Sequence, residues 1–260
     1  MTLAFIAALS YLVAAALLVG GVRRESRGRL WLIPAVVAIA CHAAAHAAAW
    51  RTGGTPDLHF FSALSLVGLG MAALTAMYGA NERMAALGVL VFPIAAAVVV
   101  AYAFRGHVDA TPLGWRLQLH AWCALLAYAT LGIAAVLAIF LWMQERALRL
   151  REFHPWLRAL PPLTELESLL FRTIAVGFAL LTATLLTGVL FVENLFAQHL
   201  VHKTVLSVLS WLAFGLLLLG RWRYGWRGAK AARWTLGAML LLMLAFFGSQ
   251  FVLEMVLKRP

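Results

Sequence analysis

Residues 117–142 read LQLHAWCALLAYATLGIAAVLAIFLW, an unbroken run without Asp, Glu, Lys or Arg. An α-helix rises about 1.5 Å per residue, so this stretch is long enough to cross the roughly 30 Å hydrocarbon core of a bilayer with some tilt. It contains one strongly polar ring, His120, which follows Arg116 by one helical turn. The stretch therefore predicts a membrane-spanning helix that carries an imidazole near one end.

The composition of the whole chain indicates the same class of protein. Hydrophobic residues make up 64% of the 260 residues, and charged residues make up only 12%. Soluble domains of this size are much less apolar, so the chain is predicted to be an all-α, polytopic membrane helical bundle. The net charge of +11 would suggest nucleic acid binding in a soluble protein. Here the basic residues lie between apolar stretches, so they indicate membrane topology, and no nucleic acid partner is expected.

Hydropathy and turn residues predict eight transmembrane spans within one integral membrane domain, residues 1–260. The loops after spans one, three, five and seven hold 15 Lys or Arg residues, whereas the other loops and the C-terminus hold 6. Because basic loops stay in the cytoplasm, both termini are predicted to lie outside. The protein itself is predicted to lie in the bacterial inner membrane, in contact with the membrane lipids. The predicted spans are about 2–20, 30–50, 60–78, 84–104, 117–142, 168–196, 204–219 and 234–257.

The longest predicted connection runs from residue 143 to residue 172. Its first half mixes arginines with Leu, Phe and Trp, which is typical of a basic segment on the anionic inner membrane surface. Near its end, Thr164 and Glu167 have the T-x-x-E spacing of a capping box, which predicts the start of the sixth helix.

The histidines gather on one predicted side of the membrane. Seven of the eight lie at or toward the outer face under the charge-derived topology. An imidazole in hydrocarbon must find a partner, so such residues are functional candidates. His120 and His202 open the fifth and seventh spans, which run in the same direction, so the two rings are predicted at the same depth. A structural hydrogen bond is the preferred interpretation of four others, namely His59, His107, His154 and His199.

His42 and His46 are four residues apart in the second span, so both project from one helix face. That spacing suits a metal, or a ligand and its support, although no Glu or Cys stands beside them to favour zinc. A functional and a structural role are equally open. Cys41 and Cys123 lie in apolar spans outside any C-x-x-C pattern, so they are interpreted as small buried residues.

Polar and small residues also follow helix faces in the last three spans. A polar stripe in span seven consists of Lys203, Ser207, Ser210 and Trp211. In span eight, Gln250 and Glu254 are four residues apart, and Lys203 is the candidate partner for the carboxylate. A stripe in span six predicts close helix packing rather than chemistry, and it consists of Thr173, Gly177, Thr184 and Gly188.

Five stretches occur in a fixed order between residues 119 and 254: LHAWCALLAYA, LPPLTELESLLFRTIAVGFALLTATLLTG, HKTVLSVLSWLAF, GWRGAKAARWTL and FGSQFVLE. Together they resemble the cytochrome c assembly family, the membrane haem-handling proteins related to CcsA and CcmC. The likeness is closest to its shorter branch, the YpjD- and HemX-type proteins. The resemblance implies a haem-binding membrane bundle.

The resemblance also implies roles for single residues. His120 stands where the family has an outer-face histidine proposed as an axial haem ligand. Lys203 and Trp211 keep the spacing of the Lys and the last Trp in the family's haem-presenting WDPKE-x-W segment. The rest of that segment is absent from ENLFAQHLVHK at 193–203, and no histidine follows the last motif in FGSQFVLEMVLKRP at 247–260. These departures favour haem binding over haem export and delivery to an apocytochrome.

We therefore expect haem b bound by His120 and His202, in a protein that resembles a cytochrome c biogenesis factor. His46 is the first replacement for His202, and His42 is the other candidate. Outer basic residues would pair with the haem propionates, namely Lys203, Arg116 and Arg51. The basic sequence GWRGAKAAR at 225–233 is interpreted as positive-inside anchoring in preference to a haem-entry site.

The protein is expected not to be an enzyme, and its expected partners are haem and other cytochrome assembly proteins. Two alternatives stay open. One is a small-molecule transporter. The sequence has no inverted repeat and no pair of broken helices in corresponding halves, which argues against a transporter. The other is a membrane scaffold of an assembly complex, in which the histidines are structural.

Overall fold

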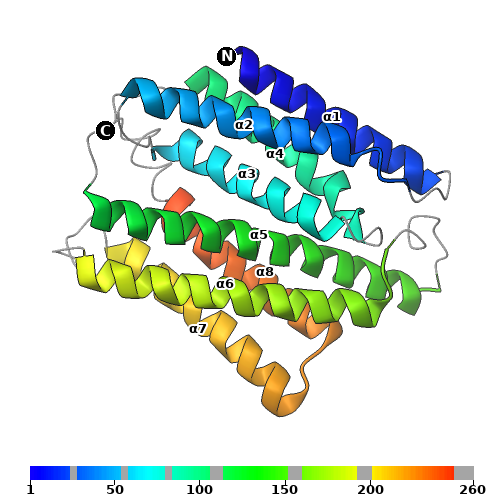
Figure 1. The fold of residues 1–260 in the computed structure, drawn as a ribbon. Coiled ribbons are helices and arrows are strands. Elements are labelled where there is room, and N and C mark those ends of the chain that lie inside the picture. The colour runs from blue at the N-terminus through cyan, green and yellow to red at the C-terminus, as the bar shows by residue number, and fades with distance from the viewer. Residues whose placement is uncertain are drawn as a thin grey trace. The chain divides into compact units, whose positions relative to one another are not determined.

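The computed structural model describes residues 1–23, 28–53, 58–79, 84–105, 114–151, 160–191 and 201–248. The regular structure in these ranges is helical, which confirms the predicted all-α class (Figure 1). Eight of the helices are long and apolar enough to cross a membrane, which confirms the number of predicted spans. The chain divides into two compact units, Met1–Pro112 with Arg146–Leu163, and Leu113–Glu145 with Thr164–Pro260.

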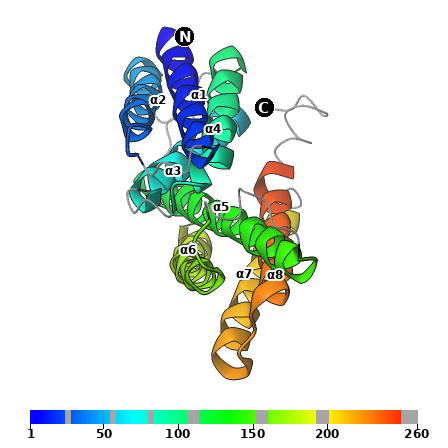
Figure 2. The same cartoon turned by 90° about the vertical axis from the view of Figure 1, so that its right-hand side faces the viewer.

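The first unit contains four spanning helices: α1 (Thr2–Arg23), α2 (Leu32–Gly53), α3 (Phe60–Gly79) and α4 (Leu87–Arg105). Helix α1 lies between α2 and α4 and packs along both, and α3 packs on α4 and α2 (Figure 2). Many of the buried residues are alanines, which allow helix backbones to approach closely. The Tyr11 and Phe92 rings stack at 5.8 Å within this core.

The second unit contains four helices: α5 (Trp115–Arg149) as far as Glu145, α6 (Leu163–Phe191) from Thr164, α7 (Val201–Tyr224) and α8 (Gly228–Met243). Helix α8 continues as the π-helical turn η3 (Leu244–Gly248). Helix α5 has 35 residues, which corresponds to about 52 Å. It therefore extends well beyond the predicted span and includes residues 143–149, which were expected to begin a surface segment. Residues 152–159 of that segment lie outside the described ranges.

Helix α6 packs on α5 through its small residues, as predicted. A side chain at Gly177 would meet Leu131 of α5, and one at Gly188 would meet His120. The predicted capping box is wrong. Helix α6 begins at Leu163, one residue before Thr164, and the Glu167 carboxylate is bound by two guanidinium groups instead of a backbone amide. Charged donors make stronger hydrogen bonds to a carboxylate than an amide does.

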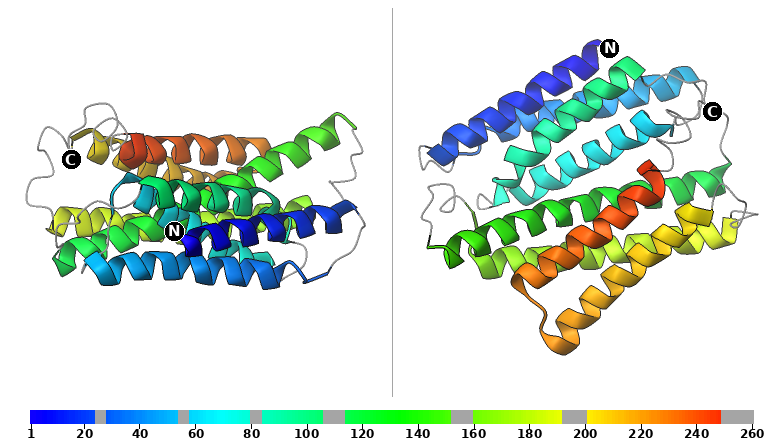
Figure 3. Two further views of the ribbon diagram at one scale, coloured as in Figure 1. Left: turned by 90° about the horizontal axis from the view of Figure 1, so that it is seen from above. Right: turned by 180° about the vertical axis from the view of Figure 1, so that it is seen from behind.

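Helices α7 and α8 run antiparallel and are joined by a short connection (Figure 3). The basic loop predicted between spans seven and eight is mostly helical, because only residues 225–227 separate the two helices. Gly225 ends α7 in the left-handed conformation, with φ of 64°, and its N–H donates to the Arg221 carbonyl at 3.2 Å. The predicted end of span seven was the residue at which the hydropathy falls. Helix α7 itself continues beyond that point to Tyr224, because arginines are good helix formers.

Candidate functional site

One end of the second unit brings together several of the predicted site residues. Consecutive helices alternate in direction, so the start of α5, the end of α6, the start of α7 and the η3 turn lie at the same end (Figure 1). We call this the histidine end, and it carries Arg116, His120, His202 and Lys203.

His120 is half-buried against α6, and its Nδ1 lies 3.2 Å from Oγ1 of Thr187. The Thr187 hydroxyl also lies 2.8 Å from the Ala183 carbonyl and 3.0 Å from the Thr184 carbonyl. A carbonyl oxygen can only accept, and a hydroxyl has only one hydrogen, so Thr187 donates that hydrogen within α6 and its oxygen accepts from His120 Nδ1–H. This arrangement favours the neutral tautomer of His120 that keeps its lone pair on Nε2.

Gly188 allows the His120 ring to lie this close to α6. A Cβ atom at Gly188 would be 3.3 Å from Cε1 of His120 and 3.6 Å from Nδ1. Within the described part of the chain, Nε2 of His120 makes no hydrogen bond. The ring is thus held through one nitrogen, and the other nitrogen is available to a ligand.

Arg116 is held at the histidine end by aromatic rings. Its guanidinium carbon lies 5.6 Å from the centre of the Trp115 ring and 5.9 Å from that of Phe191, the last residue of α6. Both distances are within the range of cation–π attraction. A fixed positive charge therefore stands one helical turn from His120.

His202 and Lys203 lie in the first turn of α7. His202 is exposed, and no hydrogen bond or ring contact joins it to His120 among the described residues. The Lys203 ammonium lies 5.7 Å from the Phe246 ring in η3. The predicted partner Glu254, with Gln250 and His199, falls outside the described ranges.

The polar stripe of α7 divides between its two neighbours. Trp211 donates its indole N–H to Oγ1 of Thr182 in α6 at 2.9 Å and stacks on Phe178 at 5.5 Å. Ser210 is buried and donates to the Ala238 carbonyl of α8 at 2.8 Å. These contacts fix α7 between α6 and α8, and a role of Trp211 toward haem stays a prediction.

His42 and His46 belong to the first unit. His42 is 0% exposed; its Nδ1 lies 3.3 Å from the Tyr11 hydroxyl and its Nε2 lies 2.8 Å from Oγ of Ser65. Nε2 of His46 lies 3.0 Å from the same Ser65 oxygen. Both nitrogens of His42 are thus engaged within this unit. Arg51, a predicted propionate partner, is exposed in the last turn of α2.

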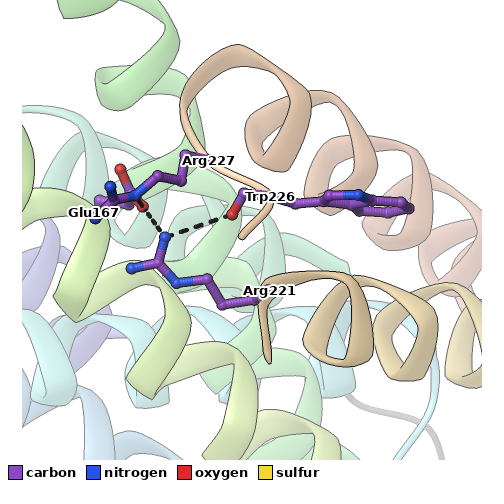
Figure 4. A network of polar contacts seen from close by, with 4 residues as sticks. All are labelled: Glu167, Arg221, Trp226 and Arg227. Atoms are coloured by element: carbon purple, nitrogen blue, oxygen red, sulfur yellow. Dashed lines mark hydrogen bonds and ion pairs between the residues drawn. The ribbon is translucent and has the colours of Figure 1, made fainter. Parts of the chain in front are cut away.

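Sequence reasoning missed the ion-pair network at the opposite end of the second unit (Figure 4). Glu167 is buried in α6, and its Oε1 accepts from Nη1 of Arg221 and, at 3.2 Å, from Nε of Arg227. Arg221 also donates to the Trp226 carbonyl at 3.5 Å. The available signal was the rarity of acidic residues, since the chain has only 10 Asp and Glu against 21 Lys and Arg. A carboxylate next to an apolar stretch needs a positive partner.

Eight spanning helices and a half-buried histidine with an available Nε2 define a multi-pass membrane protein with an imidazole site at one end of its second unit. In the described ranges, no group of three or more His, Cys, Asp or Glu residues could hold a bare metal ion.

The chain belongs to the cytochrome c assembly protein family, whose model matches residues 55–257. It is 31% identical to inner membrane protein YpjD of Escherichia coli, over 97% of this chain and 98% of that protein. It is also 27% identical to protein HemX of Brevibacillus brevis over 51% of this chain and 49% of that protein. Cytochrome c biogenesis protein CcsA of Prochlorococcus marinus is 29% identical over 34% of this chain and 29% of that protein. No solved structure matches the chain.

These findings confirm the resemblance and extend it. The five motifs covered the C-terminal half, whereas the family match begins at residue 55 and so includes α3 and α4 of the first unit.

Proposed function

We propose that this protein binds haem b at the histidine end, with His120 as an axial ligand, and that it acts in cytochrome c biogenesis in the bacterial inner membrane. Membership of the family supports a role in cytochrome c biogenesis. The eight spans and the likeness to an inner membrane protein support a location in the inner membrane. The protein binds haem without turning over a substrate, and other cytochrome assembly proteins are its partners.

The hydrogen bond between His120 and Thr187 carries the proposal. Histidines that bind metals usually donate their other ring N–H to an oxygen, which fixes the tautomer and the orientation of the ring. The 3.2 Å contact from Nδ1 to Thr187 gives His120 this arrangement and leaves Nε2 for iron. Because the side chain is half-buried, the surroundings of the iron would also be partly shielded from water.

His202 is proposed as the second axial ligand. Two neutral imidazole nitrogens bind haem iron from opposite faces, and rings on two helices can supply them. His202 lies at the same end of the unit as His120 and is exposed, so its ring can turn toward a ligand. Arg116 and Lys203, at the same end, would pair with the propionates. Haem supplies the iron centre, and the chain supplies its ligands and counter-charges.

The basic end of the second unit supports an outward position for the histidine end. The residues at the opposite end include Arg221, Arg223, Arg227, Lys230 and Arg233. Such a concentration of positive charge favours the cytoplasmic face. Arg221 and Arg227 bind Glu167 there, which favours an anchoring role for GWRGAKAAR over haem entry.

Absorbance of the detergent-purified protein tests the proposal. The expected result is a Soret band and an acid-extractable haem whose pyridine adduct has the spectrum of haem b. A transporter or a scaffold would lack both, and a colourless protein from haem-replete cells would contradict the proposal.

Thr187→Val removes the acceptor for Nδ1, whereas Thr187→Ser keeps it. Only the valine variant should shift the spectrum of the bound haem.

A further inference from the structure

Helix α8 and its η3 continuation carry an exposed stripe that changes from charged to apolar along its length. Its members follow one another at intervals of three or four residues, so they share one face of the helix. We call this the α8 stripe, and it consists of the exposed residues Lys230, Arg233, Gly237, Leu240 and Leu244. Its charged part lies at the end of the second unit opposite the histidine end, and its leucines lie deeper in the span Gly228–Gly248.

The two cations of the α8 stripe are held in place without an acidic partner. The Lys230 ammonium lies 3.7 Å from the centre of the Trp226 ring, within the range of cation–π attraction. Nε of Arg233 donates to the Ala229 carbonyl at 3.3 Å, which leaves its two Nη groups for another acceptor. Among the residues that the structure describes, neither side chain pairs with a carboxylate.

Two neighbouring arginines differ from the stripe in this respect. Arg221 and Arg227 both bind the buried Glu167 carboxylate, so their charges are compensated within the unit. Figure 4 shows the Trp226 ring pointing away from that carboxylate, and the ring faces Trp234 of α8 at 5.5 Å. The charges of the α8 stripe thus lie outside the ion-pair network, and they can attract an anion that is not part of the chain.

Gly237 leaves the stripe open next to the cations. A Cβ atom at Gly237 would meet nothing within 4 Å. This glycine comes four residues after Arg233 and three before Leu240, so the open position lies between a charge and an apolar side chain. A slender apolar group can therefore lie against the helix backbone directly beside the cations.

The length of the stripe matches one leaflet of a membrane. From Lys230 to Leu244 the helix rises about 21 Å, and a leaflet with its headgroups is half of a bilayer of about 40–45 Å. Exposed aromatic residues at the charged end mark the membrane–water interface, since Trp222 is 83% exposed and Tyr224 is 72% exposed. The α8 stripe therefore has the length and the polarity of a single phospholipid.

We propose that the α8 stripe binds one anionic phospholipid, with its phosphodiester between Lys230 and Arg233 and an acyl chain along Gly237 and the two leucines. Ammonium and guanidinium groups make strong hydrogen bonds to phosphate oxygens. A zwitterionic lipid carries an ammonium group of its own, so an anionic lipid complements the two cations better. An acidic protein segment would match the cations but not the apolar half of the stripe, which lies within a spanning helix. This site does not depend on haem.

Native mass spectrometry of the full chain tests the proposal, in titrations from detergent with dioleoylphosphatidylglycerol or dioleoylphosphatidylcholine. The two lipids have the same acyl chains, so the comparison isolates the headgroup. The wild-type protein should bind the phosphatidylglycerol at least about tenfold more tightly, and Lys230→Gln and Arg233→Gln should each weaken that binding about fivefold. Arg223→Gln is the matched control, because it removes the same charge from an exposed position of α7 outside the stripe, and it should weaken binding less than about twofold.

Gly237→Trp tests the place of the acyl chain. It fills the open position without changing the charge, and it should weaken binding of the phosphatidylglycerol severalfold. Inorganic phosphate at the same concentration as the lipid should not displace it, because phosphate has no acyl chain.

Equal affinity of the wild-type protein for the two lipids would overturn the proposal, and this comparison needs no variant. A loss in Arg223→Gln as large as that in Arg233→Gln would also overturn it, because general surface charge would then account for the binding. Displacement by phosphate, or full affinity in Gly237→Trp, would show that the stripe attracts anions without holding a lipid.

Discussion

Replacing Glu167 by alanine should destabilise the second unit more than replacing either arginine that binds it. The Glu167 side chain is only 6% exposed, whereas those of Arg221 and Arg227 are 30% and 67% exposed (Figure 4). Arg221 also packs its guanidinium 4.7 Å from the Phe171 ring. The network joins the first turns of α6 to the α7–α8 connection, so its loss affects three helices.

The exposed fractions of the three side chains determine the expected order of the losses in the free energy of unfolding. Glu167→Ala breaks the contacts to both arginines at once, but it leaves no charge buried without a partner, because both arginines can turn toward water; we therefore expect the lower end of the range of about 3–5 kcal/mol for a broken buried ion pair, about 3 kcal/mol. Arg221→Ala leaves a buried carboxylate with Arg227 as its remaining partner, which should cost about 2 kcal/mol. Arg227→Ala removes a mostly exposed partner and should cost about 1 kcal/mol or less.

Equilibrium unfolding in mixed detergent micelles, followed by tryptophan fluorescence, measures these free energies. Glu165→Ala, at an exposed carboxylate two residues earlier, is the matched control and should change stability by less than about 0.5 kcal/mol. A loss in Arg227→Ala as large as that in Arg221→Ala would refute the reasoning from burial. A Glu167→Ala variant as stable as Glu165→Ala would refute the importance of the network.

Three further predictions concern orientation and haem loading. Reporter fusions to the C-terminus should be active outside the cytoplasm, and a cytoplasmic signal would contradict the charge-derived topology. Gly188→Ala should lower haem occupancy severalfold, because its methyl group would press on His120, whereas Gly237→Ala, with nothing within 4 Å, should leave occupancy unchanged. Arg227→Ala should load haem at the wild-type level when insertion is normal, and a variant that inserts but stays haem-free would show that GWRGAKAAR has a specific role.

Much of the fold could be predicted because it depends on properties of single helices. Uncharged length predicted the eight spans, and the small-residue spacing of α6 predicted the face that packs on α5. The ends of α5 and α7 were missed because arginine-containing turns continue a helix after hydropathy has fallen.

The candidate site could be predicted only one side chain at a time. His120 was found from its own span, but its partner Thr187 is 67 residues away. Ser65, which bridges His42 and His46, is 23 and 19 residues from them, and Glu167 is 54 residues from Arg221. The two residues of each pair lie on different helices. The periodicity of one helix predicts which of its residues share a face, but it does not predict which residues of another helix that face contacts.

The most direct test of haem binding at the histidine end is the reduced absorbance spectrum of three purified single variants beside the wild-type protein. Wild type and the control His59→Ala should show the same α and Soret bands. His120→Ala should lose them, because it removes the ligand held by Thr187, and His202→Ala should change the spin state by removing the second ligand. Loss in His120→Ala with an unchanged His202→Ala spectrum would assign the second ligand to another residue. Wild-type bands in both His120→Ala and His202→Ala would contradict haem binding by this pair.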